Sequence, residues 1–302
     1  MAQQRTKKHR HCGTMSAHFR LLETDPGFRQ RQASLENATA RRMLLRTAYR
    51  TGVTTIPVVV HVVYRTASEN ISAAQIKRQI AILNKDFRAT NSDKSKVPPV
   101  WKGLVTDSRI KFLLASKDPK GKATTGITRT KTTRTSFGTG DTVKSKATGG
   151  VDGWPSTKYL NIWVCTLAGG LLGYAQFPGG PAKTDGVVIL NTAFGTGGTT
   201  KAPFNLGRTA THEVGHWLNL RHIWGDREDC GGTDYVADTP NASGPNYGKP
   251  TFPHISCNNG PNGDMFMNYM DYVDDAAMYM LTAQQVVRIH AALDGPRNAI
   301  GK

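Results

Sequence analysis

Three histidines and a glutamate fall within one short stretch, residues 212–222, which reads HEVGHWLNLRH. His212 and His216 are four residues apart, so on a helix they lie one turn apart on the same face and can bind one metal ion. Glu213, beside the first histidine, can act on a water at that metal, as in zinc hydrolases. A chance His-Glu-x-x-His is expected in roughly one such chain in two hundred. The stretch therefore predicts a helix that carries a metal site.

A third histidine, His222, follows His216 by six residues. It would leave the shared face if the helix continued, so a third ligand at this position requires the chain to turn back. Asn219 lies where that turn must come, and after glycine asparagine is the residue that most readily adopts the left-handed conformation that ends helices. The spacing predicts that His222 is the third ligand, brought round by a turn at Asn219.

These residues resemble the long zinc motif of the metzincin metallopeptidases, His-Glu-x-x-His-x-x-(Gly/Asn)-x-x-His. The longer string HEVGHWLNLRHIWGD is similar to the pappalysin family, where glycine is usual at the position of Asn219. The resemblance extends from about Val53 to Leu293. It implies an α+β zincin, in which an N-terminal mixed, twisted β-sheet with flanking helices, the zinc helix among them, precedes a smaller irregular C-terminal lobe with a Met-turn and a final helix.

The run MNYMDY at residues 267–272 is similar to the metzincin Met-turn. By this resemblance, Met270 is the turn methionine, an apolar floor beneath the three imidazoles. Tyr272 would lie near the open side of the metal, where its hydroxyl could hydrogen-bond a transition-state oxyanion. Taken alone, a run rich in Met and Tyr indicates ordinary core packing.

The residue types of the motif predict peptide-bond hydrolysis. Three neutral imidazoles leave Zn²⁺ an open position for a water whose pKa the metal lowers. Glu213 would accept the proton of that water and pass it to the leaving amine. Zn²⁺ suits a nitrogen-only ligand set with an open position, although Co²⁺ or Ni²⁺ could substitute. We therefore expect a zinc endopeptidase that acts on protein or peptide substrates.

Upstream of the motif, β-branched apolar runs predict the strands of the sheet. They cover residues 55–64, 109–115, 160–165 and 185–190, and a helix over 72–87 follows the first. Residues 169–178 have the composition of an exposed edge strand, and metzincins bind extended substrate along such an edge. The resemblance thus implies that substrate is bound by Leu171, Leu172, Gly173, Tyr174 and Ala175. The catalytic domain would span residues 53–302, with an upper lobe to about 219 and a lower lobe from about 220.

Four cysteines are present, and each has its own surroundings. Cys230 and Cys257 bracket a loop-rich stretch that a disulfide could clamp, which implies an oxidising compartment. Cys165 follows a strand-like run and is interpreted as a buried free thiol. Within the loop-rich stretch, closely spaced oxygen-bearing side chains suggest a calcium site, with a polar turn as the alternative. Those side chains belong to Asp234, Asp238 and Thr239.

Cys12 lies in a basic leader, residues 1–52, that holds eleven Lys or Arg against three acidic residues. In metzincins a prosegment cysteine commonly takes the open position of the zinc, and Cys12-Gly13-Thr14 looks like such a switch. A soft thiolate is a good zinc ligand. The alternative is a terminal thiol without a role. We predict that residues 1–52 are a removable propeptide, cleaved in the basic region from Arg41 through Arg46 to Arg50.

The whole chain of 302 residues carries a net charge of +17. This charge leaves open a basic non-enzymatic binder of nucleic acid or an anionic surface, although no nucleic-acid motif accompanies it. A zinc-bound pseudoenzyme is a further alternative, which the intact Glu213 disfavours. No apolar run approaches the roughly 20 residues that span a bilayer. We expect a secreted monomer whose signal peptide has been removed, with export by another route as the alternative.

Overall fold

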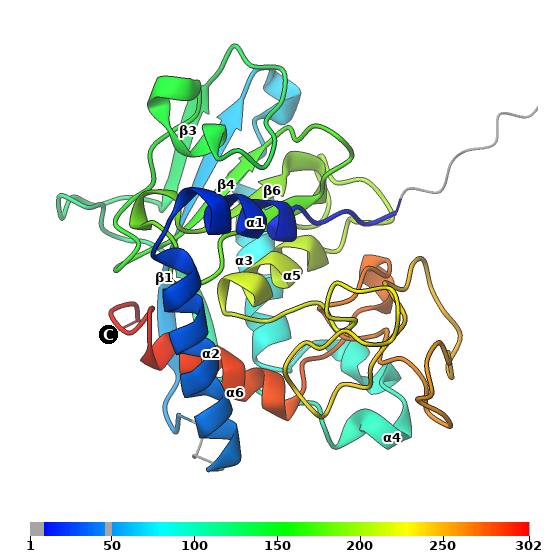
Figure 1. The fold of residues 1–302 in the computed structure, drawn as a ribbon. Coiled ribbons are helices and arrows are strands. Elements are labelled where there is room, and N and C mark those ends of the chain that lie inside the picture. The colour runs from blue at the N-terminus through cyan, green and yellow to red at the C-terminus, as the bar shows by residue number, and fades with distance from the viewer. Residues whose placement is uncertain (1–8, 46–49, 302) are drawn as a thin grey trace, which may run out of the picture.

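A computed structural model describes residues 9–45 and 50–301 (Figure 1). The α-helices are α1 (Thr14–Thr24), α2 (Phe28–Leu44), α3 (Ala73–Phe87), α4 (Pro99–Lys102), α5 (Arg208–Trp217) and α6 (Ala283–Asp294). The strands are β1 (Thr54–Tyr64), β2 (Ile110–Leu114), β3 (Ile127–Lys131), β4 (Leu160–Cys165), β5 (Gly173–Ala175) and β6 (Val187–Leu190).

The strands form one mixed sheet in the order β2-β1-β4-β6-β5, and β3 also pairs with β1. β1 runs parallel to β2, β3 and β4, and β6 runs parallel to β4. Only β5, at the edge, is antiparallel to its neighbour β6. Strands buried on both faces read as continuous apolar runs, which is why β1 and β4 could be recognised from their Val- and Ile-rich sequences. The mixed sheet predicted from the sequence is confirmed.

Helices α3 and α5 pack together and cover the sheet. α3 begins at Ser72, whose side chain accepts a hydrogen bond from the Gln75 backbone N–H. Its apolar stripe, Ile76, Ile80, Leu83 and Phe87, is buried in the main core. α5 contacts β5 and β6, so the sheet and α3 together fix the helix that carries the metal motif.

Downstream of α5 the chain is irregular, in agreement with the expected C-terminal lobe. Residues 218–282 contain one 3₁₀ turn, Asp275–Ala277, and otherwise loops and isolated bridges. These loops lie together in yellow and orange in Figure 1. The predicted disulfide between Cys230 and Cys257 is present, with the two Cα atoms 5.8 Å apart. By the chain-entropy estimate, closing such a loop stabilises the fold by about 3–4 kcal/mol. α6 then begins at a capping box formed by Thr282 and Gln285.

The basic leader folds into two helices, which the sequence interpretation left without structure. α1 packs against β5, and α2 lies alongside α6 (Figure 1). The buried face of α2 consists of Phe28, Gln32, Leu35 and Thr39, and only half of these side chains are apolar. The hydrophobic periodicity is therefore weak. Of the expected cleavage region, Arg46 lies outside the described residues. In the described part of the chain, no helix has the length and apolar character needed to cross a membrane.

Candidate active site

Helix α5 and the turn after it bring the three histidines of the motif together. The Nε2 atom of His216 lies 3.2 Å from that of His212 and 3.0 Å from that of His222. The helix ends at Trp217, and Asn219 then adopts a left-handed backbone with φ +74°. All three imidazoles are buried. The turn at Asn219 thus places His222 opposite the two helical histidines.

The Nδ1 atom of each histidine, which faces away from the common centre, lies within hydrogen-bond distance of an oxygen acceptor. The Nδ1 atoms of His212 and His216 each lie 2.8 Å from a backbone oxygen, of Tyr269 and Leu220 respectively. The Nδ1 atom of His222 lies 2.5 Å from the Asp226 carboxylate. Because these partners only accept, each Nδ1 donates and each Nε2 presents a lone pair to the common centre. Burial further lowers the pKa of His212 and His216, which favours neutral rings.

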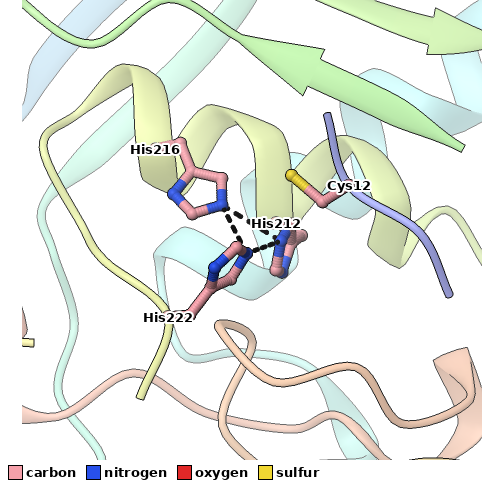
Figure 2. Close-up of side chains that lie close together, drawn as sticks. All are labelled: Cys12, His212, His216 and His222. Carbon is pink, nitrogen blue, oxygen red and sulfur yellow. Dashed lines mark hydrogen bonds between the residues drawn. The ribbon is translucent and has the colours of Figure 1, made fainter. Parts of the chain in front are cut away.

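Cys12 points at the same centre from the leader (Figure 2). In the part of the chain that the structure describes, its Sγ and one nitrogen from each histidine all lie within 4.8 Å of one another. Three imidazole nitrogens and one thiol form a four-donor set of the composition that zinc takes in tetrahedral sites. Three lone pairs that face one another without a proton between them are otherwise unfavourable, so the donor set fits a metal ion.

Glu213 lies beside this centre and contacts the leader. Its Oε2 accepts a hydrogen bond from the Thr14 hydroxyl at 2.9 Å and lies 3.3 Å from Cys12 Sγ. Burial raises the pKa of Glu213 to about 7, although these two contacts and Arg10 act to lower it. A carboxyl group with a pKa near neutrality can both accept and return a proton, as a general base must.

The strand β5, predicted as an exposed edge, is covered by the leader. Cys12 forms a parallel bridge with Gly173, and the Gly13 N–H donates to Gly173 O at 2.8 Å. The Leu172 N–H donates to His11 O at 2.9 Å. All five predicted substrate-binding residues, Leu171, Leu172, Gly173, Tyr174 and Ala175, are buried. The expectation of exposure is therefore wrong for this form of the chain, because the leader satisfies the edge hydrogen bonds.

Gly173 is needed where the leader, β5 and α5 meet. A Cβ atom built at this position would lie 2.8 Å from Glu213 Cγ and 2.9 Å from the Val188 carbonyl oxygen. No side chain fits without displacing the glutamate. The glycine therefore allows the edge strand to approach the carboxyl group closely.

Met270 packs against helix α5, and Tyr272 packs against the histidine rings. Met270 is fully buried, and a Cβ atom at Gly215 of α5 would lie 2.5 Å from its Sδ atom. The Tyr272 ring is 4.9 Å from the His222 ring and 4.7 Å from Trp224, centroid to centroid. An apolar side chain thus lies against α5, and a phenol ring lies next to His222.

In addition to the histidine centre, a separate pocket encloses the side chain of Arg10 of the leader. Its guanidinium donates to Asp275 Oδ1 at 2.7 Å, to Thr209 Oγ1 at 3.1 Å and to Val273 O at 3.2 Å. It also lies 5.0 Å from the centre of the Phe204 ring. The side chains of Arg10 and Asp275 are 1 % and 0 % exposed. The residue two positions before Cys12 thus has its basic side chain fully enclosed.

The residues predicted for calcium are engaged with protein groups. The Thr239 hydroxyl donates to Asp234 Oδ2 at 2.7 Å. Both carboxylate oxygens of Asp238 instead accept hydrogen bonds at the start of α6, from Thr282 and Gln284. Nothing in this arrangement supports a calcium ion, and calcium stays a prediction from the sequence.

Sequence reasoning did not assign roles to Arg10, Thr14 or Asp226. For Asp275 it went part of the way: the resemblance to family members that favour Arg or Lys after the scissile bond pointed to an acidic residue following the Met-turn, and both Asp274 and Asp275 stand there. Asp226 ends the string HEVGHWLNLRHIWGD, and a carboxylate four residues after a metal ligand is a signal for a partner of the ring's other nitrogen. Arg10 and Thr14 flank the candidate switch cysteine at two residues on either side. Both side chains lie close to the histidine centre, with Arg10 bonded to Asp275 and Thr14 to Glu213. Their spacing around Cys12 was the available signal.

Comparisons with known proteins relate this chain to metallopeptidases. Residues 144–294 match the family model of peptidases described as pregnancy-associated plasma protein-A. An extracellular metalloprotease of Pyricularia oryzae is 31 % identical over 252 residues, covering 80 % of this chain and 76 % of the relative. Other curated relatives match a shorter part of the chain, and an extracellular metalloprotease of Colletotrichum graminicola is 39 % identical over 139 residues. The chain spans about half the length of the first curated relatives it matches.

Two solved structures cover more of the chain. Mature mirolysin of Tannerella forsythia in complex with a cleaved peptide has a TM-score of 0.82 at 49 % identity, covering 83 % of this chain and 97 % of that one. A promirolysin mutant of the same organism has a TM-score of 0.89 at 45 % identity and covers 97 % of both chains. The fold thus matches that of metzincin-type metallopeptidases. The chain belongs to the pappalysin family of peptidases, and membership implies a zinc ion.

Proposed function

We propose that this chain is a secreted zinc endopeptidase made as a latent zymogen. The observation that carries the proposal is that the leader occupies three parts of one site. Cys12 lies at the histidine centre, residues 11–13 pair with the edge strand, and Arg10 fills the pocket of Asp275. The names of the curated relatives, extracellular metalloproteases, support secretion. No observation favours a non-enzymatic binder.

In the proposed reaction, His212, His216 and His222 hold the zinc ion. When bound, Zn²⁺ polarises the scissile carbonyl and lowers the pKa of water. Once the leader has left, Glu213 accepts the proton of the attacking water and delivers it to the leaving amine. The Tyr272 hydroxyl donates a hydrogen bond to the developing oxyanion.

The substrate backbone is held by the edge of β5, which the leader now covers. The Gly173 carbonyl and the Leu172 and Ala175 N–H groups bond the leader, and they become free for an extended peptide. Met270 supports α5 from below. The fit of Gly215 against its sulfur keeps the two helical histidines in place.

Latency follows from the same contacts. The Cys12 thiolate would fill the zinc position that substrate and water need. Thr14 at the same time occupies the Glu213 oxygen that would accept the proton. Cleavage between about Arg41 and Arg50, as the sequence predicts, would separate residues 1–52 from the catalytic domain 53–302. Removal of the leader would then uncover zinc, base and edge strand together.

The Arg10 pocket indicates which peptide bonds are cut. Because Asp275 pairs with an arginine of the leader near the metal, it can pair with a basic substrate side chain, which we place just after the scissile bond. Asp275→Asn should lower kcat/KM for a peptide with Arg at that position by about 100-fold, and that for the matching Leu peptide by far less. The measurement is the ratio of kcat/KM for the Arg peptide to kcat/KM for the Leu peptide, determined with the activated chain and with its Asp275→Asn variant. An unchanged ratio would remove Asp275 from substrate selection.

The metal requirement tests the proposed function itself. After removal of the leader by limited proteolysis, the chain should degrade casein, and a zinc chelator should abolish this activity. Adding back Zn²⁺ in slight excess should restore at least half of it, because the histidines stay pre-organised by Tyr269, Leu220 and Asp226. Fluorescent casein with and without chelator measures the effect. Cleavage that persists when the zinc content has fallen to zero would contradict the proposal.

A further inference from the structure

A carboxylate of the leader is bound at a second place, away from the metal. Glu36 of α2 accepts two hydrogen bonds of 2.8 Å from the guanidinium of Arg288, one on each oxygen. Its Oε1 also accepts from Asn219 Nδ2 at 3.3 Å and lies 4.0 Å from Arg221. The side chain of Arg288 is 2 % exposed and that of Glu36 22 %. The paired geometry is the one in which guanidinium groups bind carboxylates most strongly.

The catalytic domain itself holds the two arginines in place. Arg288 donates to the Asn219 carbonyl oxygen from Nε at 3.2 Å and Nη2 at 3.1 Å. Arg221 lies 4.6 Å from the centre of the Phe177 ring and 5.9 Å from that of Tyr235. None of these partners belongs to the leader. The site is therefore built to receive a carboxylate, whichever chain supplies it.

The electrostatics agree with this geometry. Burial acts to raise the pKa of Glu36, but the hydrogen bonds and charges of Arg288 and Arg221 lower it overall. The carboxylate is thus bound in its charged form. Loss of Glu36 with the leader would leave two guanidinium groups close together without that counter-ion.

The site lies close to the proposed cleft. The Phe177 ring is 5.5 Å from the His216 ring and 4.6 Å from Arg221 Cζ, so the arginine is no more than about 10 Å from this histidine. An extended peptide covers that distance in about three residues. Cys12 pairs in parallel with Gly173, and the Ala175 N–H donates to the Thr14 hydroxyl, so Phe177 lies beyond Thr14, on the side away from Arg10 and Asp275.

We propose that Arg288, Arg221 and Asn219 form a carboxylate-binding subsite of the activated enzyme. It selects an Asp or Glu side chain about three to five residues before the scissile bond, and Glu36 fills it in the latent chain. This inference rests on the proposed function, because it places a substrate in the cleft with the residue after the scissile bond at Asp275.

Paired peptides test the subsite. Each peptide carries Arg just after the scissile bond and either Glu or Gln at one of the positions two to six residues before it. For the activated chain, kcat/KM should be roughly three- to tenfold higher with Glu than with Gln at one or two neighbouring positions. This Glu-to-Gln ratio should fall to about one in Arg288→Gln and should persist in Arg65→Gln, an exposed arginine elsewhere. A ratio is independent of the amount of folded enzyme.

The outcomes separate the two proposals. If the peptides are cut after the expected residue but the ratio is one at every position, the subsite is overturned and the enzyme stands. If no peptide is cut, the proposed function fails, and the carboxylate site is then decided on the latent full chain. In the latent full chain, Glu36→Ala should lower Tm. Sodium formate should then raise the Tm of the Glu36→Ala variant more than sodium chloride does at equal ionic strength. The carboxylate site is overturned if formate gives Glu36→Ala no such extra rise in Tm, or if it gives the same extra rise in the double variant Glu36→Ala with Arg288→Gln.

Discussion

Glu213→Gln should reduce peptide hydrolysis by the activated chain by about 10³-fold, within the range that general acid–base groups contribute. The substitution keeps the size and shape of the side chain but removes its ability to accept a proton. Glu213 does not belong to the metal-binding group of Cys12 and the three histidines. The zinc content should therefore stay at one ion per chain. Initial rates on a peptide with Arg after the scissile bond, together with metal analysis, check both expectations.

Glu228→Gln is the matched control, because Glu228 is an exposed glutamate in the loops after the motif. It should leave the rate within about twofold of the wild type, as expected for surface substitutions. If Glu213→Gln retained a tenth or more of the wild-type rate with a full complement of zinc, another group would have to be the base. The role given to Glu213 would then be withdrawn.

Cys12→Ala should make the full-length chain active while its leader is still attached. The thiol is the leader's only donor in the metal-binding group found among the described residues, so its loss opens a position for water. We expect the activity of the uncleaved chain to rise by about 100-fold, to a value below that of the activated enzyme. It stays below because Arg10 and Thr14 still hold the leader on Asp275 and Glu213. The rate must be measured before any cleavage is visible on a gel.

Cys165→Ala serves as the control for removal of a thiol. Cys165 is buried in β4, and burial raises its pKa, so it is an inert thiol away from the metal centre. This variant should remain latent. A Cys12→Ala chain that is as silent as the wild type would show that the leader blocks the cleft without the thiol, through its backbone pairing and Arg10.

The parts of the structure that the sequence predicted are those set by local pattern. The zinc helix and its turn follow from the spacing of three histidines and from a residue at position 219 that tolerates positive φ. The buried strands β1 and β4 follow from uninterrupted apolar runs, and the ends of α3 and α6 from capping residues. Each of these signals lies within a few residues of the feature that it determines.

The parts that could not be predicted depend on contacts between distant segments. Arg10 meets Asp275 across 265 residues, and Glu36 meets Arg288 across 252. No local pattern in a single amino-acid sequence indicates either of these contacts. The edge strand was assigned correctly in position but not in exposure, because its partner is the leader rather than solvent. Helix α2 buries polar side chains such as Gln32 and Thr39, which hides its helical periodicity.

The ligand set of zinc in the purified, uncleaved chain tests the central claim most directly. X-ray absorption at the zinc edge should show three nitrogen ligands at about 2.0–2.1 Å and one sulfur at about 2.3 Å. In Cys12→Ala the sulfur should be replaced by a light ligand, with the three nitrogens unchanged. A zinc shell without sulfur in the wild-type chain would contradict the account of latency. A shell with fewer than three nitrogens would contradict the metal site itself.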